Sequence, residues 1–231
     1  MKPFRFKNFT INQSEKVFRV GTDGVLLGVL ATVENAGHIL EVGTGTGLIS
    51  LMLSQRNRNA AILAIDFSKD AAQLASENFK NSPFSKNLKA LEQDFKTFES
   101  EEKFDVIVSN PPYFEKNQSE KDVIARQQTE LSFDDLIEKS VKNLKEQGLF
   151  AVIIPFESGD YFSQKCLDFG LHLSKKIKIF GIKNPLPKRL LLEFGFGKKE
   201  MVEEEFIIEK SPRIYSNEYL KLTEEFHVFK P

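Results

Sequence analysis

From residue 38 onward, short apolar runs alternate with longer helical stretches, and this alternation constrains the fold more than any other feature of the sequence. The runs are too short for helices and are typical of buried parallel strands. Ser68 and Ser132 are suitable helix N-caps, and Gly148 is a suitable stop. The sequence therefore predicts a doubly wound α/β domain with a mostly parallel sheet and helices on both faces. The expected strands are His38–Val42, Ala60–Ile65, Leu88–Leu91, Phe104–Val108 and Leu149–Ile154, and the expected helices are Leu48–Ser54, Lys69–Asn78 and Ser132–Asn143.

The pattern changes after residue 170. Leu171–Phe180 and Leu190–Phe196 indicate two further strands, and the residues that join them, 181–187, favour a loop over a helix. We expect an antiparallel pair at one edge of the sheet. Residues 1–37 are too few for a domain of their own, so we expect an N-terminal extension packed on a single domain that spans 1–231.

Composition excludes several classes of protein. The chain contains no apolar run long enough to span a membrane, and its first residues lack the features of a signal peptide. The single cysteine, Cys166, cannot form an internal disulfide, which fits a reducing cytoplasm. The histidines His38, His172 and His227 lack metal-ligand spacing. We expect a cytoplasmic monomer that uses no metal and contacts no membrane.

The net charge of −1 hides a local asymmetry. Residues 165–199 hold nine basic side chains against two acidic ones, whereas the residues from Glu200 onward hold eight glutamates. A basic run of this kind is more often a solvated face than a nucleic-acid site. Both interpretations stay open at this stage.

A glycine-rich loop, 43–47, follows the first expected strand and opens a helix. Glycines let a backbone turn sharply and approach a ligand closely. Their G-x-G-x-G spacing differs from the G-x-G-x-x-G of dinucleotide sites, which disfavours a nicotinamide cofactor. Glu41, just before the turn, suits a cationic amine better than a pyrophosphate.

Two carboxylates follow at the ends of the next strands. Asp66 is placed to take both hydroxyls of a ribose. Asp94 can accept a hydrogen bond from an adenine amino group, and Phe95 can supply a ring face. The alternative is a set of ordinary strand-to-helix turns. The set resembles the S-adenosyl-L-methionine site of class I methyltransferases; its residues are Glu41, Gly43, Thr44, Gly45, Gly47, Asp66, Phe67, Asp94, Phe95 and Asn110.

Asn110-Pro111-Pro112-Tyr113 follows the fourth expected strand. The prolines fix two φ angles, so the carbonyls are rigidly aimed. The Asn110 side-chain oxygen and the Pro111 carbonyl can hold both hydrogens of an amino group, which orients the nitrogen lone pair at a methyl donor. Tyr113 can stack on a planar acceptor. The alternative is a proline-rich turn, but the motif resembles that of the class I amino-methyltransferases.

Other segments resemble the bacterial valine-tRNA (adenine-37-N6)-methyltransferases. The likeness covers nearly the whole chain and is most specific in Phe6–Ile11 with Gln13, and in Val20–Gly28. It continues at Ala125-Arg126, at Leu131-Ser132 and at Pro187-Lys188-Arg189; Gln127 departs from the histidine often found after Ala-Arg.

This resemblance implies a Rossmann-like fold, S-adenosyl-L-methionine as cofactor and adenine 37 of a valine tRNA as acceptor. It places the turn at Thr22 and Asp23 over the methionine end of the cofactor; the alternative is that either residue only caps a helix beginning near Gly24. The RNA contacts that we expect are Arg126, Lys183, Lys188 and Arg189. Other acceptors (another RNA base, DNA adenine or a protein glutamine) remain open, as does a non-catalytic module that binds cofactor or RNA.

Overall fold

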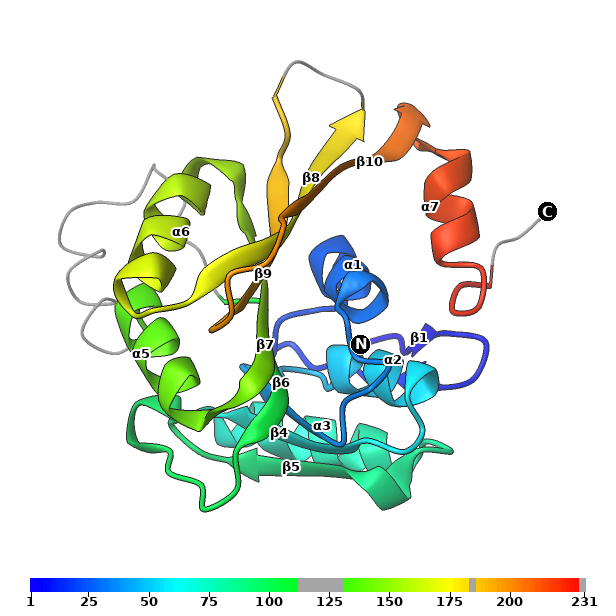
Figure 1. Cartoon of the computed structure of the whole chain (residues 1–231). Helices are drawn as coiled ribbons and strands as arrows, with labels where there is room; N and C mark the ends of the chain where they lie inside the picture. Colours follow the sequence, from blue (N-terminus) through cyan, green and yellow to red (C-terminus); the bar gives the residue numbers. More distant parts are fainter. Residues whose placement is uncertain (112–130, 183–185, 229–231) are drawn as a thin grey trace, which may run out of the picture.

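The computed structural model describes residues 1–111, 131–182 and 186–228. The strands of its main sheet are β3 (His38–Val42), β4 (Ala61–Asp66), β5 (Leu88–Glu92), β6 (Phe104–Ser109), β7 (Leu144–Pro155), β8 (His172–Ile182), β9 (Arg189–Gly195), β10 (Val202–Ser211) and β11 (Ile214–Tyr215). Their order across the sheet is β11-β10-β8-β9-β7-β6-β3-β4-β5 (Figure 1). The helices are α1 (Thr22–Leu30), α2 (Leu48–Arg56), α3 (Lys69–Lys80), α5 (Phe133–Asn143), α6 (Gly159–Asp168) and α7 (Asn217–Leu222).

The strands from β5 to β7 are all parallel, as expected for a doubly wound sheet. β9 lies between β7 and β8 and is antiparallel to both, which confirms the expected antiparallel pair. The sheet continues past this pair, because β10 adds to β8 in parallel and β11 closes the edge. The sequence patterns did not predict β10, β11, α6 or α7.

One helix stop was wrong. The third expected helix does end at Asn143, but β7 begins at the next residue, Leu144, and Gly148 lies inside that strand. A Cβ on Gly148 would stand 2.7 Å from Cδ1 of Leu144 and 3.0 Å from the carbonyl oxygen of Lys145. Glycine is therefore needed at this position because Leu144 and Lys145 of the same strand lie too close for a side chain, and not because a helix ends here.

Helices cover both faces of the sheet (Figure 1). Alternate strand residues point to opposite faces, so Ile39 packs with side chains of α1 and α2, whereas Leu40 packs with side chains of α5 and α6. Glu41 is next, and it returns to the α2 face, where it is fully buried. None of the helices in the described part of the chain is long and apolar enough to span a membrane.

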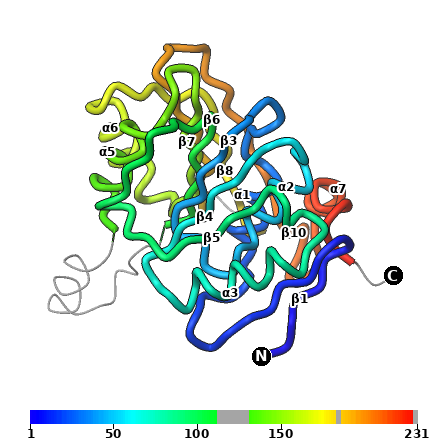
Figure 2. The backbone as a smooth tube through the Cα atoms, turned by 90° about the horizontal axis from the view of Figure 1, so that it is seen from below, coloured from blue at the N-terminus to red at the C-terminus, as the bar shows by residue number. Residues whose placement is uncertain are grey.

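The first residues pack on the α2–α3 side of the sheet (Figure 2). A short antiparallel pair, β1 (Phe4–Arg5) and β2 (Thr10–Ile11), brings Phe6 and Ile11 into a cluster with side chains of α2 and α3. This region also contacts the far end of the chain: Phe6 forms an isolated bridge with His227, and the Lys7 amide donates to the Phe226 carbonyl over 2.8 Å.

Candidate active site

The glycine loop joins the end of β3 to the start of α2, as predicted. Gly43, Gly45 and Gly47 have φ angles of 77°, 55° and 80°, which side chains rarely adopt. A Cβ on Gly47 would also stand 2.5 Å from Cε1 of Phe79 in α3. The loop is thus held open by glycine geometry and by close packing against α3.

Glu41 is buried at the closed end of this loop. Its Oε2 atom accepts hydrogen bonds from the Thr44 hydroxyl (2.8 Å), from the Ser50 amide (3.1 Å) and from the Ser50 hydroxyl. Its Oε1 atom is buried and has no hydrogen-bond partner among the described residues. Burial raises the pKa of Glu41 to about 7. The site therefore holds a spare acceptor whose charge a cationic ligand would stabilise.

Asp66 links two of the predicted elements. Its Oδ2 atom accepts from the Gly45 amide and its Oδ1 atom accepts from the Ser68 amide, both over 2.9 Å. Burial raises the pKa of Asp66. The carboxylate therefore fixes the glycine loop to the start of α3, a structural role that the sequence did not reveal, while the adjacent Phe67 is 69 % exposed.

Asp94 and Phe95 differ in their surroundings. The Gln93 amide donates to the Asp66 carbonyl over 2.8 Å, so the Asp94 turn lies beside the Asp66 turn. Asp94 caps a 3₁₀ turn by accepting from the Lys96 amide. Phe95 is only 3 % exposed and packs in the core, whereas Phe67 is exposed. The expected contact of the Phe95 ring with a ligand stays a prediction.

Asn110 lies directly after β6 and beside the glycine loop. Ser109 pairs with Val42 in the sheet, and its hydroxyl donates to the Val42 carbonyl over 2.9 Å, so Asn110 follows at the level of Gly43. The Asn110 Oδ1 atom is buried and has no hydrogen-bond partner among the described residues, and Pro111 is buried beside it. A buried amide oxygen without a partner costs free energy, unless a ligand supplies the donor.

Four predicted site residues, Pro112, Tyr113, Arg126 and Lys183, lie outside the described residues.

The start of α1 excludes the alternative that Thr22 or Asp23 caps this helix. Thr22 and Asp23 lie inside the first turn, the N-cap is Gly21, and no side chain caps this end. Asp23 instead accepts from Nε of Arg189, the first residue of β9, over 2.8 Å. Arg189, which we expected to bind RNA, therefore ties β9 to α1, whereas its neighbour Lys188 is exposed.

The basic run is largely balanced by the acidic segment that follows it. β8 and β10 pair so that Lys176 lies opposite Glu203 and Lys178 opposite Glu205, and Lys178 forms an ion pair with Glu203. Lys175 reaches back to the Leu30 carbonyl and to Glu193. On β8, the solvated-face interpretation therefore holds, and Lys188 is an exposed cation directly before β9.

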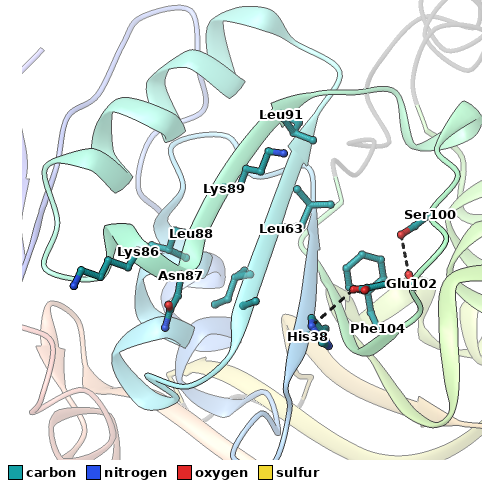
Figure 3. Close-up of a pocket in the computed structure, with 12 residues that line it drawn as sticks. His38, Leu63, Lys86, Asn87, Leu88, Lys89, Leu91, Ser100, Glu102 and Phe104 are labelled. Carbon is teal, nitrogen blue, oxygen red and sulfur yellow. Dashed lines mark hydrogen bonds and ion pairs between the residues drawn. The ribbon is translucent and has the colours of Figure 1, made fainter.

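A separate pocket of about 400 Å³ begins at the amino-terminal ends of β3 and β4 and extends along the strands to Leu63 and Leu91 (Figure 3). It is lined by the first residues of β3 and β4, His38 and Ala61, and by Lys89, Glu102 and Phe104. Gly43 and Asp66 lie at the other ends of the same strands. Because doubly wound sheets bind ligands beyond the carboxyl ends of their strands, this pocket is not part of the candidate site.

Sequence reasoning missed two residues of the site, Ser50 and Ser109. Both are buried hydroxyls: Ser50 lies within the apolar segment Leu48–Leu53, and Ser109 directly follows the apolar segment Val106–Val108. A buried hydroxyl needs a partner, so an isolated serine in such a segment was the available signal.

The sequence model of one protein family, the methyltransferase small domain, matches residues 13–162 of this chain. A tRNA1(Val) (adenine(37)-N6)-methyltransferase from Flavobacteriaceae bacterium (strain 3519-10) is 54 % identical over 231 residues, all of both chains. The chain belongs to this family. The expected family and the class I α/β fold are confirmed, and the protein is a methyltransferase.

Solved structures agree with this family at the level of the fold. A predicted O-methyltransferase from Agrobacterium tumefaciens has a TM-score of 0.69 at 18 % identity and covers 88 % of this chain and 96 % of its own. A glycopeptide N-methyltransferase complexed with S-adenosyl-L-methionine has a TM-score of 0.53 at 10 % identity, over 70 % of this chain and 87 % of its own. Members of the tRNA1(Val) methyltransferase family thus share their fold with methyltransferases of other substrates.

Proposed function

We propose that the protein transfers the methyl group of S-adenosyl-L-methionine to N6 of adenine 37 in the anticodon loop of a valine tRNA. The single observation that carries the proposal is the buried Oδ1 atom of Asn110 beside the glycine loop, which has no hydrogen-bond partner among the described residues. The name of the 54 % identical relative supports this choice of acceptor.

The residues present fit the cofactor. The spare Oε1 atom of Glu41 suits the ammonium group of the methionine end. The Asp66 oxygens suit the ribose hydroxyls, since each uses one backbone amide and keeps a lone pair. Phe67 presents an exposed ring to the adenine, and Asp94 suits its amino group. When bound, the cofactor supplies an electrophilic methyl group on a sulfonium.

The chain's own contribution to the reaction is the placement of the acceptor. An adenine amino nitrogen is a poor nucleophile because its lone pair is delocalised into the ring. Asn110 Oδ1 and the Pro111 carbonyl accept its two hydrogens, which turns the lone pair toward the methyl group and stabilises the positive charge that develops on nitrogen. Formation of the N–C bond would be matched by loss of the methyl–sulfur bond, with a neutral thioether as leaving group, and the proton of the methylated amino group would pass to solvent water.

An anticodon loop suits this site because its bases are already unpaired, so adenine enters at little cost. The phosphate contacts that we propose are Lys188, which is exposed, Lys183, which belongs to the same basic run, and Arg126, which follows the catalytic motif in the sequence. Arg189 contributes by positioning this turn against α1.

The test is methyl transfer to unmodified transcripts of valine tRNA, followed by mass spectrometry of the nucleosides. We expect N6-methyladenine in the wild-type transcript and none in a transcript with guanine at position 37. Methylation of duplex DNA, of a glutamine-containing protein or of another RNA base, but not of adenine 37, would contradict the proposal.

A further inference from the structure

Residues 12–21, which connect β2 to α1, form a strap along α3 (Figure 2). The Asn12 amide donates to Oδ1 of Asn78 over 2.9 Å, and Nδ2 of Asn78 donates to the Asn12 carbonyl over 3.1 Å. Lys16 forms a 3.1 Å ion pair with Asp70 at the start of the helix. The strap is therefore fixed to α3 at two separated places.

The strap ends beside the glycine loop. The buried Val17 side chain packs on α3, and its Cγ1 atom lies 3.9 Å from the place where a Cβ on Gly45 would stand. The Val20 amide donates to Oε1 of Gln13 over 3.1 Å, which closes the strap on itself. The residues between Val17 and Val20 thus lie at the mouth of the candidate site.

Those residues are Phe18 and Arg19. Phe18 is 88 % exposed, and Arg19 is exposed and makes no ion pair within the described part of the chain. Consecutive Cα atoms are about 3.8 Å apart, so the Cα atoms of Phe18 and Arg19 are one and two such steps from that of Val17, which lies beside Gly45. α1 begins three residues after Arg19, and its Asp23 holds Arg189 of β9. The pair therefore lies in the chain between Val17, which is beside the glycine loop, and Asp23, which holds the start of β9.

A single exposed apolar side chain is ordinary on a protein surface. Phe18 differs because its neighbour Arg19 is a cation without an ion pair among the described residues. In addition, the strap fixes the backbone of Phe18 at the mouth of the candidate site. An aromatic ring beside a guanidinium is the combination that binds unpaired nucleotides, through base stacking and phosphate contact. Because the strap is already ordered, little conformational entropy is lost on binding.

We infer that Phe18 and Arg19 form a tRNA-binding contact, in which Phe18 stacks on an unpaired base of the anticodon loop and Arg19 binds a phosphate. The inference rests on the proposed function, which supplies the RNA occupant. Two neighbouring residues offer too small an apolar area for a stable protein interface, which needs about 800 Å² from each partner.

The experiment compares tRNA affinity, S-adenosyl-L-methionine affinity and thermal stability in variants of the full chain. Phe18→Ala and Phe18→Leu should each weaken tRNA binding by roughly 5- to 140-fold, the equivalent of about 1–3 kcal/mol per stacked base. Phe18→Tyr, which keeps the ring, should bind like wild type. Arg19→Ala should weaken binding and reduce the slope of log affinity against log salt by about 0.7–0.9.

Ile214→Ala on the edge strand β11 is a control for loss of exposed apolar area, and Arg5→Ala on β1 is a control for loss of charge. Both should leave tRNA affinity unchanged. An active wild type in which Phe18→Ala binds tRNA normally would overturn this inference alone, whereas a wild type that methylates no tRNA would overturn the proposed function. An equal loss of cofactor affinity would assign the ring to the cofactor, and a change in oligomeric state would assign it to a second copy; either result overturns the RNA contact.

Discussion

Replacing Glu41 by glutamine removes one ionisable group from the buried end of β3 and keeps the shape of the side chain. Burial raises the pKa of this carboxyl from 4.5 to about 7, although three hydrogen bonds to Oε2 oppose the shift. Glutamine can offer one oxygen to the same three donors, so the variant should fold. What it loses is the pH dependence that the carboxylate imposes on the folded state.

The direction in which stability changes with pH follows from the number of protons that the folded and unfolded states bind. Between pH 4.5 and 7 the folded protein holds a proton on Glu41 that the unfolded chain has released, so stability falls as the pH rises through this range. At about 1.36 kcal/mol per pKa unit, the full effect is about 3 kcal/mol above pH 8, of which about 1 kcal/mol is already present at pH 5. The difference in unfolding free energy between wild type and Glu41→Gln should therefore change by about 2–3 kcal/mol between pH 5 and pH 8.

Urea denaturation of both proteins without cofactor, at pH 5 and pH 8, measures this difference, because the contributions of all other groups cancel. If the unfolding free energies of wild type and Glu41→Gln changed by the same amount between pH 5 and pH 8, the reasoning would be refuted. With S-adenosyl-L-methionine, the affinity of wild type should rise about fivefold from pH 6 to pH 7, as ionised Glu41 becomes available to the ammonium group. Calorimetry should find no such rise in Glu41→Gln.

Three further predictions concern other parts of the site. Asn110→Ala should lower kcat by two to three decades, about 3–4 kcal/mol, with cofactor affinity nearly unchanged; near-normal turnover would exclude the orienting role. Asp66→Ala should weaken the cofactor and also destabilise the fold by about 1–3 kcal/mol, since two loop amides lose their acceptor; a thermal-shift experiment without ligand that finds no destabilisation would contradict this. Asp23→Ala and Arg189→Ala should show a coupling energy of about 1 kcal/mol in a double-mutant cycle of stability, and strict additivity would mean that their ion pair contributes nothing.

Regular features of the fold were predictable because their physics is local. The apolar strands and the serine caps of α3 and α5 depend on neighbouring residues, and the structure confirms them. β10 was not predictable in this way. Its three consecutive glutamates, Glu203–Glu205, contradict a strand on local grounds, and they are compensated by lysines of β8 that lie more than twenty residues earlier.

The candidate site shows the same limit. Asp66 and Asp94 are each followed by a phenylalanine, and the sequence does not distinguish Phe67 from Phe95. The structure exposes Phe67 and buries Phe95, whose ring lies 5.9 Å from that of Phe98. Which ring faces a ligand depends on this core packing rather than on the motif.

The bridge between Phe6 and His227 has a consequence for the order in which the molecule is assembled. The hydrogen bonds of the glycine loop to Glu41 and Asp66, and its close packing on Phe79, join residues within 41–79, so they can form early during synthesis. The N-terminal pair that anchors the strap, in contrast, gains its contacts with Phe226 and His227 only after those residues have left the ribosome. On a growing chain, the contacts of the glycine loop with Asp66 and Phe79 can therefore precede those that join the N-terminal pair to the last residues of the described chain.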